Sequence, residues 1–248
     1  MRSRRWFIRF GGAALLAGTT RATHAQERSA TSQPVWLPMV QAAPPASSVD
    51  AVPTDAPLLG PPSGTAAQAI AYLARRAAGY TTYDITSIVS AYQQQGEPVG
   101  VDWFLALAQM AHETGSLTSW WSQRPRRNPA GIGVTGRVLP GTPDTPPQGD
   151  WAWHNNQWEE GVSFATWADD GIPAQLGRLL AYALRDEQMN DAQKALSDKA
   201  LAYRAMPASL RGSATTIVGL NGRWAWPGTN YGQMILDLMQ RMKAEDEV

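Results

Sequence analysis

The sequence predicts a mainly α-helical domain with a small β-hairpin, preceded by a signal peptide and a disordered Pro-rich linker. Apolar residues recur at helical spacing through most of residues 65–243. Two segments of alternating apolar residues flank Asn155-Asn156, which is typical of a tight hairpin. Before residue 65 the composition shifts to Pro, Ala, Ser and Thr, without a periodic pattern long enough to form a core. One folded domain over residues 65–243 is therefore expected.

Residues 1–25 have the features of a signal peptide. A charged segment is followed by a short apolar stretch and by Thr23-His24-Ala25, which is a small-residue cleavage site. Ser3-Arg4-Arg5-Trp6-Phe7-Ile8 resembles the twin-arginine export motif, which implies export in the folded state. The apolar stretch is well short of the roughly 20 residues that span a bilayer, which disfavours a transmembrane anchor. We expect the processed protein outside the cytoplasm, without stable membrane insertion.

Residues 26–64 are expected to form a disordered linker. They are rich in Pro, Ala, Ser and Thr and include Pro44-Pro45 and Pro61-Pro62. One apolar patch, Val35–Val40, interrupts this composition, and we interpret it as part of the tether.

Charge and composition exclude several functions. The chain has 21 basic and 21 acidic residues, but five arginines lie in residues 1–25, so 16 basic residues against 21 acidic ones leave a charge of −5. Such a domain has no broad positive field for binding nucleic acid. The absence of cysteine excludes disulfides and thiolate ligands, and only three histidines are present. Neither a metal nor a cofactor is expected.

Apolar stripes place the helices along the chain. Residues 101–114 are apolar nearly all round, which is typical of a helix through the middle of a domain, and Gly115 is expected to end it. The Gly- and Pro-rich residues 136–149 predict a loop or flap before the hairpin. Other helices are expected over residues 70–77, 85–92, 172–183 and 191–206, and from residue 229 onward.

Glu113 is the only acidic residue between Trp103 and Thr114, and it lies at the C-terminal end of the central helix. Partial burial and the negative end of the helix dipole both disfavour the carboxylate. Its pKa should therefore rise toward the range that a general acid needs. Its position alone also fits a glutamate that simply reaches solvent at a helix end.

Two motifs carry a resemblance to a known family. The run from Leu105 to Gly115, which ends in His112-Glu113-Thr114-Gly115, is followed by Asn128-Pro129-Ala130-Gly131-Ile132-Gly133. Together they resemble the core of the bacterial endo-β-N-acetylglucosaminidase (glucosaminidase) family, and the similarity extends over about residues 101–239. The Asn-Pro-Ala turn departs from the commoner Asn-Asn-Leu-Phe type of the family.

The resemblance implies a lysozyme-like, mainly helical fold with a groove for glycan. It places the catalytic acid at Glu113 and a cleft-lining tyrosine at Tyr231. It also implies that the turn with Asn128 and Gly131 borders a sugar subsite, although the altered turn changes the details of that subsite.

Hydrolysis of a glycoside usually needs a second group besides the acid. The family often places an acid on the β element facing the catalytic glutamate, which makes Glu160 the candidate, with Glu159 beside it. The acetamido group of the substrate is the alternative. Asp169 and Asp170 are better explained as helix caps.

Tryptophan is unusually frequent, with 11 in all and nine between Trp103 and Trp226. Sugar rings stack on aromatic planes, so tryptophans outside the core could line a glycan groove. Trp103 and Trp167 are expected to pack in the core. The candidates for substrate binding are Trp121, Trp158 and Trp224, with Trp120, Trp151 and Trp153 as further platforms.

Two other motifs are accidental matches. Gly131-Ile132-Gly133-Val134-Thr135-Gly136 fits the dinucleotide fingerprint, but no helix is expected after it. His112-Glu113 begins a zinc-protease motif, yet Ser116 stands where the second histidine is required.

The sequence thus predicts an exported hydrolase of β-1,4 bonds at N-acetylglucosamine, with peptidoglycan as the expected substrate and Glu113 protonating the leaving oxygen. A lytic transglycosylase and a catalytically silent wall-binding module remain alternatives. The expected partner is the polysaccharide alone. The protein should be a secreted or cell-wall-associated monomer that needs no cofactor.

Overall fold

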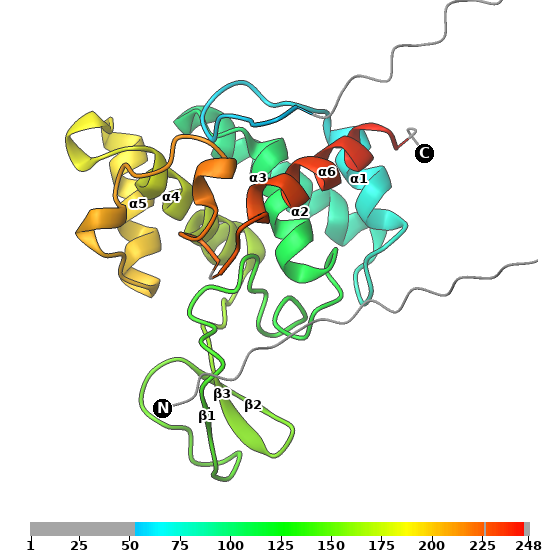
Figure 1. Cartoon of the computed structure of the whole chain (residues 1–248). Coiled ribbons are helices and arrows are strands. Elements are labelled where there is room, and N and C mark those ends of the chain that lie inside the picture. The colour runs from blue at the N-terminus through cyan, green and yellow to red at the C-terminus, as the bar shows by residue number, and fades with distance from the viewer. Residues whose placement is uncertain (1–52, 226, 246–248) are drawn as a thin grey trace, which may run out of the picture. The chain divides into compact units, whose positions relative to one another are not determined.

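The computed structural model describes residues 53–225 and 227–245. The expected signal peptide, residues 1–25, and the expected linker up to residue 52 lie outside the described residues. The described chain is mainly helical and carries one small antiparallel sheet of three strands, as the sequence predicts (Figure 1). Within this part, none of the helices is both long and apolar enough to cross a membrane.

The described residues form six α-helices, and each covers or overlaps a segment where the apolar spacing predicts one. Side chains of Thr65, Thr81 and Asn190 accept hydrogen bonds from the backbone in the first turns of three of them, which fixes where these helices begin. The helices are α1 (Ala66–Ala74), α2 (Thr82–Gly96), α3 (Trp103–Thr114), α4 (Ile172–Ala183), α5 (Asp191–Tyr203) and α6 (Tyr231–Lys243).

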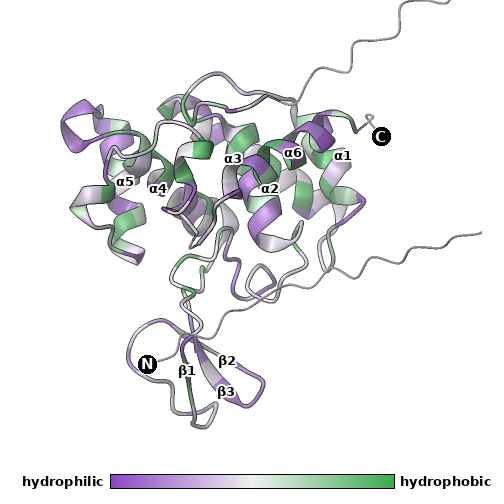
Figure 2. Cartoon of the chain, in the orientation of Figure 1, coloured by the Kyte–Doolittle hydropathy of each residue, from purple (hydrophilic) through white to green (hydrophobic). Residues whose placement is uncertain are grey.

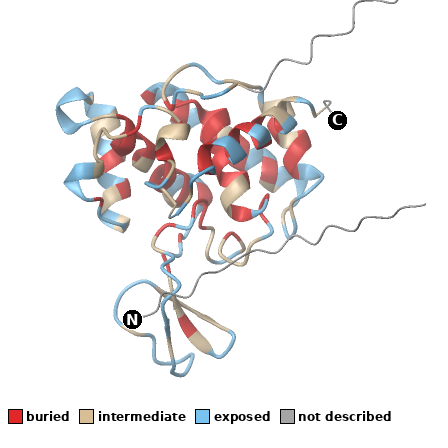
Figure 3. Ribbon diagram, viewed as in Figure 1, coloured by how far each residue is buried: buried red, intermediate tan, exposed pale blue. Residues whose placement is uncertain are grey.

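Helix α3 forms the centre of the core. The Asp102 carboxylate accepts hydrogen bonds from two backbone amides at its start, and Gly115, with φ 57°, ends it in the left-handed region. Residues 103–111 are all buried. Figure 3 shows this burial along α3 and α4, and Figure 2 shows the same helices rich in apolar residues. The prediction of a helix that is surrounded on all sides is confirmed.

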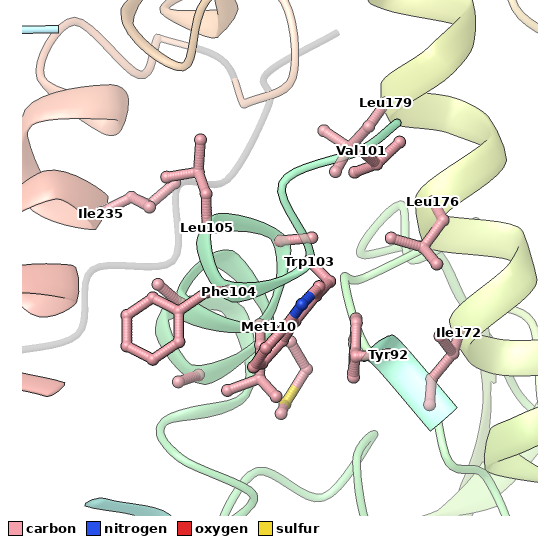
Figure 4. Packing of buried hydrophobic residues seen from close by; sticks show 14 of the residues in the cluster. Tyr92, Val101, Trp103, Phe104, Leu105, Met110, Ile172, Leu176, Leu179 and Ile235 are labelled. Carbon is pink, nitrogen blue, oxygen red and sulfur yellow. The ribbon is translucent and has the colours of Figure 1, made fainter. Parts of the chain in front are cut away.

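Side chains of α3 pack against helices that are distant in sequence. Phe104 and Leu105 belong to the same buried cluster as Ile235 of α6 and Leu176 of α4 (Figure 4). Trp103 and Trp167 are also buried there, as expected. Helix α3 therefore shares one core with α4 and α6.

The predicted linker is too long at its C-terminal end. Leu58 is 1% exposed, its N–H donates to Thr215 O at 2.9 Å, and its carbonyl oxygen accepts from Asp102 N at 3.0 Å. Residues 57 and 59 form antiparallel bridges with Thr216 and Val101. The Pro-rich composition hid Leu58 and Leu59, whose apolar side chains and paired backbone make this stretch part of the domain.

The sheet contains the predicted hairpin and one strand that the sequence does not predict. Strands β2 (Trp151–His154) and β3 (Gln157–Glu160) are antiparallel, and both turn asparagines have positive φ, 49° and 60°. Asparagine tolerates this conformation in a two-residue turn. Strand β1 (Val138–Leu139) lies in the segment expected to be a loop and pairs with β3 on its other edge.

Two helix ends differ slightly from expectation. Helix α5 stops at Tyr203 rather than near Met206. Before α4, residues 167–171 form one turn of π-helix. Its N-cap is Thr166, whose hydroxyl oxygen accepts a hydrogen bond from Asp169 N at 2.9 Å. Asp170 completes this cap, since its carboxylate accepts from Thr166 N. The two aspartates therefore act at the helix start, as predicted, but as partners of a threonine cap.

A second, small core cluster lies beneath the turn at residues 128–133. It contains Ala130, Ile132, Val162, Phe164 and Ala174, with Tyr203 and Trp224 partly buried against it. The backbone of Val162, which follows β3, donates to Ile132 O at 3.1 Å. The turn is thus fixed between the base of the hairpin and α4.

Candidate functional site

Glu113 occupies the last turn of α3 and is partly exposed, unlike the buried residues that precede it. The hydroxyl of Tyr231, the first residue of α6, donates a hydrogen bond of 2.6 Å to Glu113 Oε1. Tyr231 is only 2% exposed. The packing of α3 against α6 therefore brings together the two residues to which the resemblance assigns the catalytic acid and the cleft tyrosine.

The pKa of Glu113 is raised from 4.5 to about 7. Removal of water from around the carboxyl is the main cause, and the hydrogen bond from Tyr231 and an interaction with Trp224 act in the opposite direction. No other carboxylate within the described chain contributes to this shift. Near neutral pH, Glu113 is consequently divided between an acid that can donate a proton and a carboxylate that can accept one.

A chain of buried hydrogen bonds fixes the orientation of the Tyr231 hydroxyl. Gln109 Nε2 donates to Tyr231 Oη at 2.8 Å, and Gln175 Nε2 donates to Gln109 Oε1 at 2.8 Å and to Ala106 O at 2.9 Å. A carbonyl oxygen can only accept, so the bond to Ala106 fixes the orientation of the Gln175 amide. The Tyr231 oxygen therefore accepts from Gln109, which leaves its proton to point at Glu113.

The chain extends to α2, since Tyr92 OH donates to Gln175 Oε1. Tyr92, Gln109 and Gln175 are each 0% exposed. A buried polar network of this kind holds its members in place because any displacement leaves a donor or acceptor without a partner. The position of the Glu113 carboxyl is thus set by four helices.

The other carboxyl oxygen faces the turn at Gly131. This glycine has φ 61°, and a Cβ added to it would lie 3.7 Å from Glu113 Oε2. Asn128 builds the turn: its Nδ2 donates to Ile132 O and Val162 O, each at 2.9 Å, and its Oδ1 accepts from Ala130 N and Ile132 N. Since Oε1 accepts from Tyr231, an acidic proton is best placed on Oε2, toward the turn.

A polar cavity of about 130 Å³ adjoins this turn. It is lined by residues 130–135, with Arg178, Tyr182, Arg204 and Trp224. The rings of Tyr182 and Trp224 are 5.7 Å apart. Trp224, which the sequence predicts at the substrate site, thus lines the cavity, and it also acts to lower the pKa of Glu113.

Four of the predicted site residues lie elsewhere or act differently. Asn128 is 1% exposed, and its amide makes four hydrogen bonds to the backbone of the turn and of Val162, so in this structure it shapes the turn. Trp158 is 6% exposed, packs against Trp153 and donates to Thr142 O, which makes it a core residue of the sheet. Trp121 packs over Gly161, where an added Cβ would meet its ring at 2.5 Å.

Glu160 is the fourth predicted site residue that lies elsewhere or acts differently. Its Oε1 accepts from Arg137 at 3.0 Å, and its Oε2 accepts from the hydroxyl of Thr135. The carboxylate is therefore held within the hairpin and the adjoining loop, and no contact links it to Glu113. These contacts do not support the prediction that Glu160 faces the acid. The sequence places Glu160 on the hairpin but does not show that Arg137 of the neighbouring loop will pair with it.

Another predicted platform is also occupied. Trp120 lies between the guanidinium of Arg126, 3.7 Å from its ring, and the imidazole of His154, whose ring is stacked at 4.0 Å. Both faces of this indole are used inside the protein. The stack ties the loop after α3 to strand β2.

Several residues of this site were missed from the sequence. Gln109 and Gln175 are single amides in otherwise apolar helices. Since a buried amide must find hydrogen-bond partners, each of them indicates a buried polar network. Arg178 and Arg204 gave no signal, since arginine on a helix or in a loop is usually exposed.

A larger hollow of about 370 Å³ lies between α2 and α5, lined by residues such as Gln95, Pro98, Leu196 and Lys199. Its lining contains no carboxyl or imidazole group. Within residues 53–225 and 227–245, no group of three or more His, Cys, Asp or Glu side chains is placed to hold a metal ion.

No family model, no curated protein and no solved structure matches the chain.

Proposed function

We propose that this protein is an exported glycosidase with a lysozyme-like fold that cleaves β-1,4 bonds at N-acetylglucosamine in peptidoglycan, with Glu113 as general acid. The observation that carries the proposal is the environment of this carboxyl. Burial raises its pKa to about 7, Tyr231 holds one oxygen, and the other faces the Gly131 turn. A carboxyl that can be protonated at neutral pH is what the cleavage of a glycosidic bond requires.

In the proposed reaction, Glu113 donates its proton to the glycosidic oxygen as the bond from that oxygen to C1 breaks. Positive charge then develops on C1 and on the ring oxygen of the sugar. Glu160 is bound to Arg137 and Thr135. The stabilising group we propose is therefore the acetamido carbonyl oxygen of the substrate, which bonds to C1 as the leaving sugar departs.

The second step restores the enzyme. Water adds to C1, the bond from C1 to the acetamido oxygen breaks, and the Glu113 carboxylate takes a proton from that water. Tyr231 supports both steps, since its hydroxyl can keep donating to Oε1 while Oε2 loses and regains the proton. A pKa near the working pH suits a group that must be acid and base in turn.

The remaining parts of the proposal rest on the chain as a whole. A mainly helical domain with a small sheet and a carboxyl at the end of its central helix supports a lysozyme-like arrangement. The signal-like residues 1–25 support export, to a location outside the cytoplasm where the wall polymer lies. We propose that the protein acts as a monomer, secreted or attached to the wall, without metal or cofactor.

The decisive experiment compares Glu113→Gln with the unaltered protein on purified peptidoglycan. Glutamine keeps the size of the side chain and can still accept from Tyr231, but it has no titratable proton. We expect activity to fall by about 100- to 10,000-fold, the usual contribution of a general acid. Glu187→Gln is the matched control, because Glu187 is exposed on a short turn after α4. Equal activity of Glu113→Gln and the control would refute the mechanism.

Analysis of the products separates the alternatives. A hydrolase leaves a reducing N-acetylglucosamine end, whereas a lytic transglycosylase leaves an anhydro-muramyl end. Polymer that is bound but uncut would indicate a wall-binding module.

A further inference from the structure

Two arginines meet at the cavity beside the candidate acid. Arg178 projects from α4 and Arg204 follows the end of α5, and both line the cavity next to the Gly131 turn. The guanidinium of Arg178 donates to Arg204 O at 2.6 Å, which joins the two elements at this point. Arg178 is half-buried and Arg204 is exposed.

Neither guanidinium has an acidic partner within the described part of the chain. The ion pairs found there involve neither Arg178 nor Arg204, and the lining of the cavity includes no carboxylate. Nearby acids are already used: Glu160 pairs with Arg137, and Asp170 accepts from Tyr203. Burial lowers the pKa of Arg178, and the charge of Arg204 acts in the same direction, whereas Tyr182 acts in the opposite one.

The aromatic residues connect these cations to the acid. Trp224 lies 6.0 Å from the Arg178 guanidinium and 5.7 Å from the Tyr182 ring, and it acts to lower the pKa of Glu113. The turn that lines the cavity is the one that faces Glu113 Oε2. A sugar whose linkage reaches Glu113 would therefore place its neighbour, or the substituents of that neighbour, within reach of the arginines.

We propose that Arg178 and Arg204 form a carboxylate-binding subsite that recognises an acidic substituent on the sugar next to the cleaved bond. A guanidinium presents a planar fork of donors that matches the two oxygens of a carboxylate. The inference rests on the proposed function and assigns residues to the recognition of the proposed wall-polymer substrate. It favours strands that alternate N-acetylglucosamine with a lactyl-bearing acidic sugar over neutral chitin-like polymers.

The carboxylate has two possible sources on such a strand: the free lactyl group of a bare acidic sugar, or a residue of the peptide attached to it. The test measures binding by calorimetry in the Glu113→Gln background, where no probe is cut. The probes are an oligosaccharide of N-acetylglucosamine alone, an alternating strand without peptides and the same strand with peptides. We expect at least one acidic probe to bind about 10- to 100-fold more tightly than the neutral one.

Adding Arg178→Gln and Arg204→Gln should remove that preference and leave binding of the neutral probe unchanged within about twofold. If the double variant binds the bare strand more weakly, the lactyl carboxylate is the group recognised. If it binds only the peptide-bearing strand more weakly, the carboxylate belongs to the peptide. Arg75→Gln is the matched control, because Arg75 is an exposed arginine at the end of α1 that pairs with Glu245. The proposal would be overturned if the Glu113→Gln protein bound neutral and acidic probes equally well. It would also be overturned if the two arginine substitutions weakened binding of all three probes by the same factor.

Arg178→Gln removes a bond between α4 and Arg204 and could disturb the fold, so Arg204→Gln is also tested alone. Within the described residues, the Arg204 side chain forms no hydrogen bond or ion pair, and its loss should leave the thermal midpoint unchanged. Failure of the proposed glycosidase function would give a different result from failure of the arginine subsite. In that case the unaltered protein cuts none of the probes, while binding still reports whether the arginines prefer an acidic one.

Discussion

At the scale of single residues, the state of Glu113 depends on two opposed effects. Burial favours the neutral acid, whereas the hydroxyl of Tyr231 stabilises the carboxylate by donating to it. The balance leaves the pKa near neutrality. Without the tyrosine the carboxyl would hold its proton more strongly and would lose a hydrogen bond that fixes its orientation.

Tyr231→Phe should therefore change the pH profile as well as the rate. We expect kcat/KM to fall by about 10- to 100-fold, because a hydrogen bond to a charged group contributes about 1.5–3 kcal/mol. The hydrogen bond lowers the pKa of Glu113, so its removal should move the loss of activity at alkaline pH to a higher pH. Measurement of kcat/KM against pH tests both effects.

Tyr83→Phe is the control for that measurement, since Tyr83 is 81% exposed at the start of α2. Its profile should match that of the unaltered protein. An alkaline limb of Tyr231→Phe that stays in place or moves to lower pH would contradict the role given to this hydroxyl.

The residues of the site differ in how far they could be predicted. Glu113 stood out because it is a single acid on an apolar helix, and Tyr231 came from the resemblance alone. Trp158 misled the prediction, because an alternating pattern shows which residues share a face of a hairpin but not which face becomes covered. Arg178 and Arg204 meet only through the packing of α4 on α5, which no local pattern reveals.

At the scale of elements, the turn at residues 128–133 brings backbone close to the carboxyl. The buried amide of Asn128 satisfies four backbone groups of the turn and of the strand base, so the backbone keeps one shape. Gly131 adopts positive φ there and leaves open the space beside Glu113 Oε2. That space is where a glycosidic oxygen would have to approach.

Gly131→Ala should abolish most activity while the protein stays folded. The added methyl group would lie about 3.7 Å from Glu113 Oε2 and occupy the approach to it. Gly136→Ala is a matched control in the same loop: its φ is 75°, and no atom lies within 4 Å of the added Cβ. Both variants should lose about 1–2 kcal/mol of stability from the left-handed backbone, measured by urea unfolding.

Only Gly131→Ala should lose activity on wall polymer, by about 100-fold or more if the approach is closed. If the two variants retain equal activity, the space beside Oε2 is not where the substrate reacts.

The elements themselves were largely predictable because periodicity reports burial. The stripes of α1 to α6 and the Asn-Asn hairpin follow directly from apolar spacing and turn preference. Strand β1 has two residues, which is too short to show an alternating pattern. Leu58 and Leu59 lie in a Pro-rich stretch and pair with residues far along the chain, so local composition assigned them to the linker.

At the scale of the whole molecule, the site carries a cost in stability that depends on pH. The folded domain raises the pKa of Glu113 from 4.5 to about 7. Between these two values the folded state holds a proton that the unfolded chain has released. Stability must therefore fall as the pH rises through this interval and level off above it.

The pH dependence of the free energy of unfolding can be measured with urea for Glu113→Gln and the unaltered protein from about pH 4 to pH 8. Glutamine has no proton to lose, so the variant should gain relative stability across the interval, by at most about 3 kcal/mol from a shift of this size. Glu187→Gln should follow the unaltered protein at every pH, because this side chain is exposed. If the curves of Glu113→Gln and the unaltered protein stay parallel, the carboxyl is not desolvated by folding, and the basis for its acidity at neutral pH is lost.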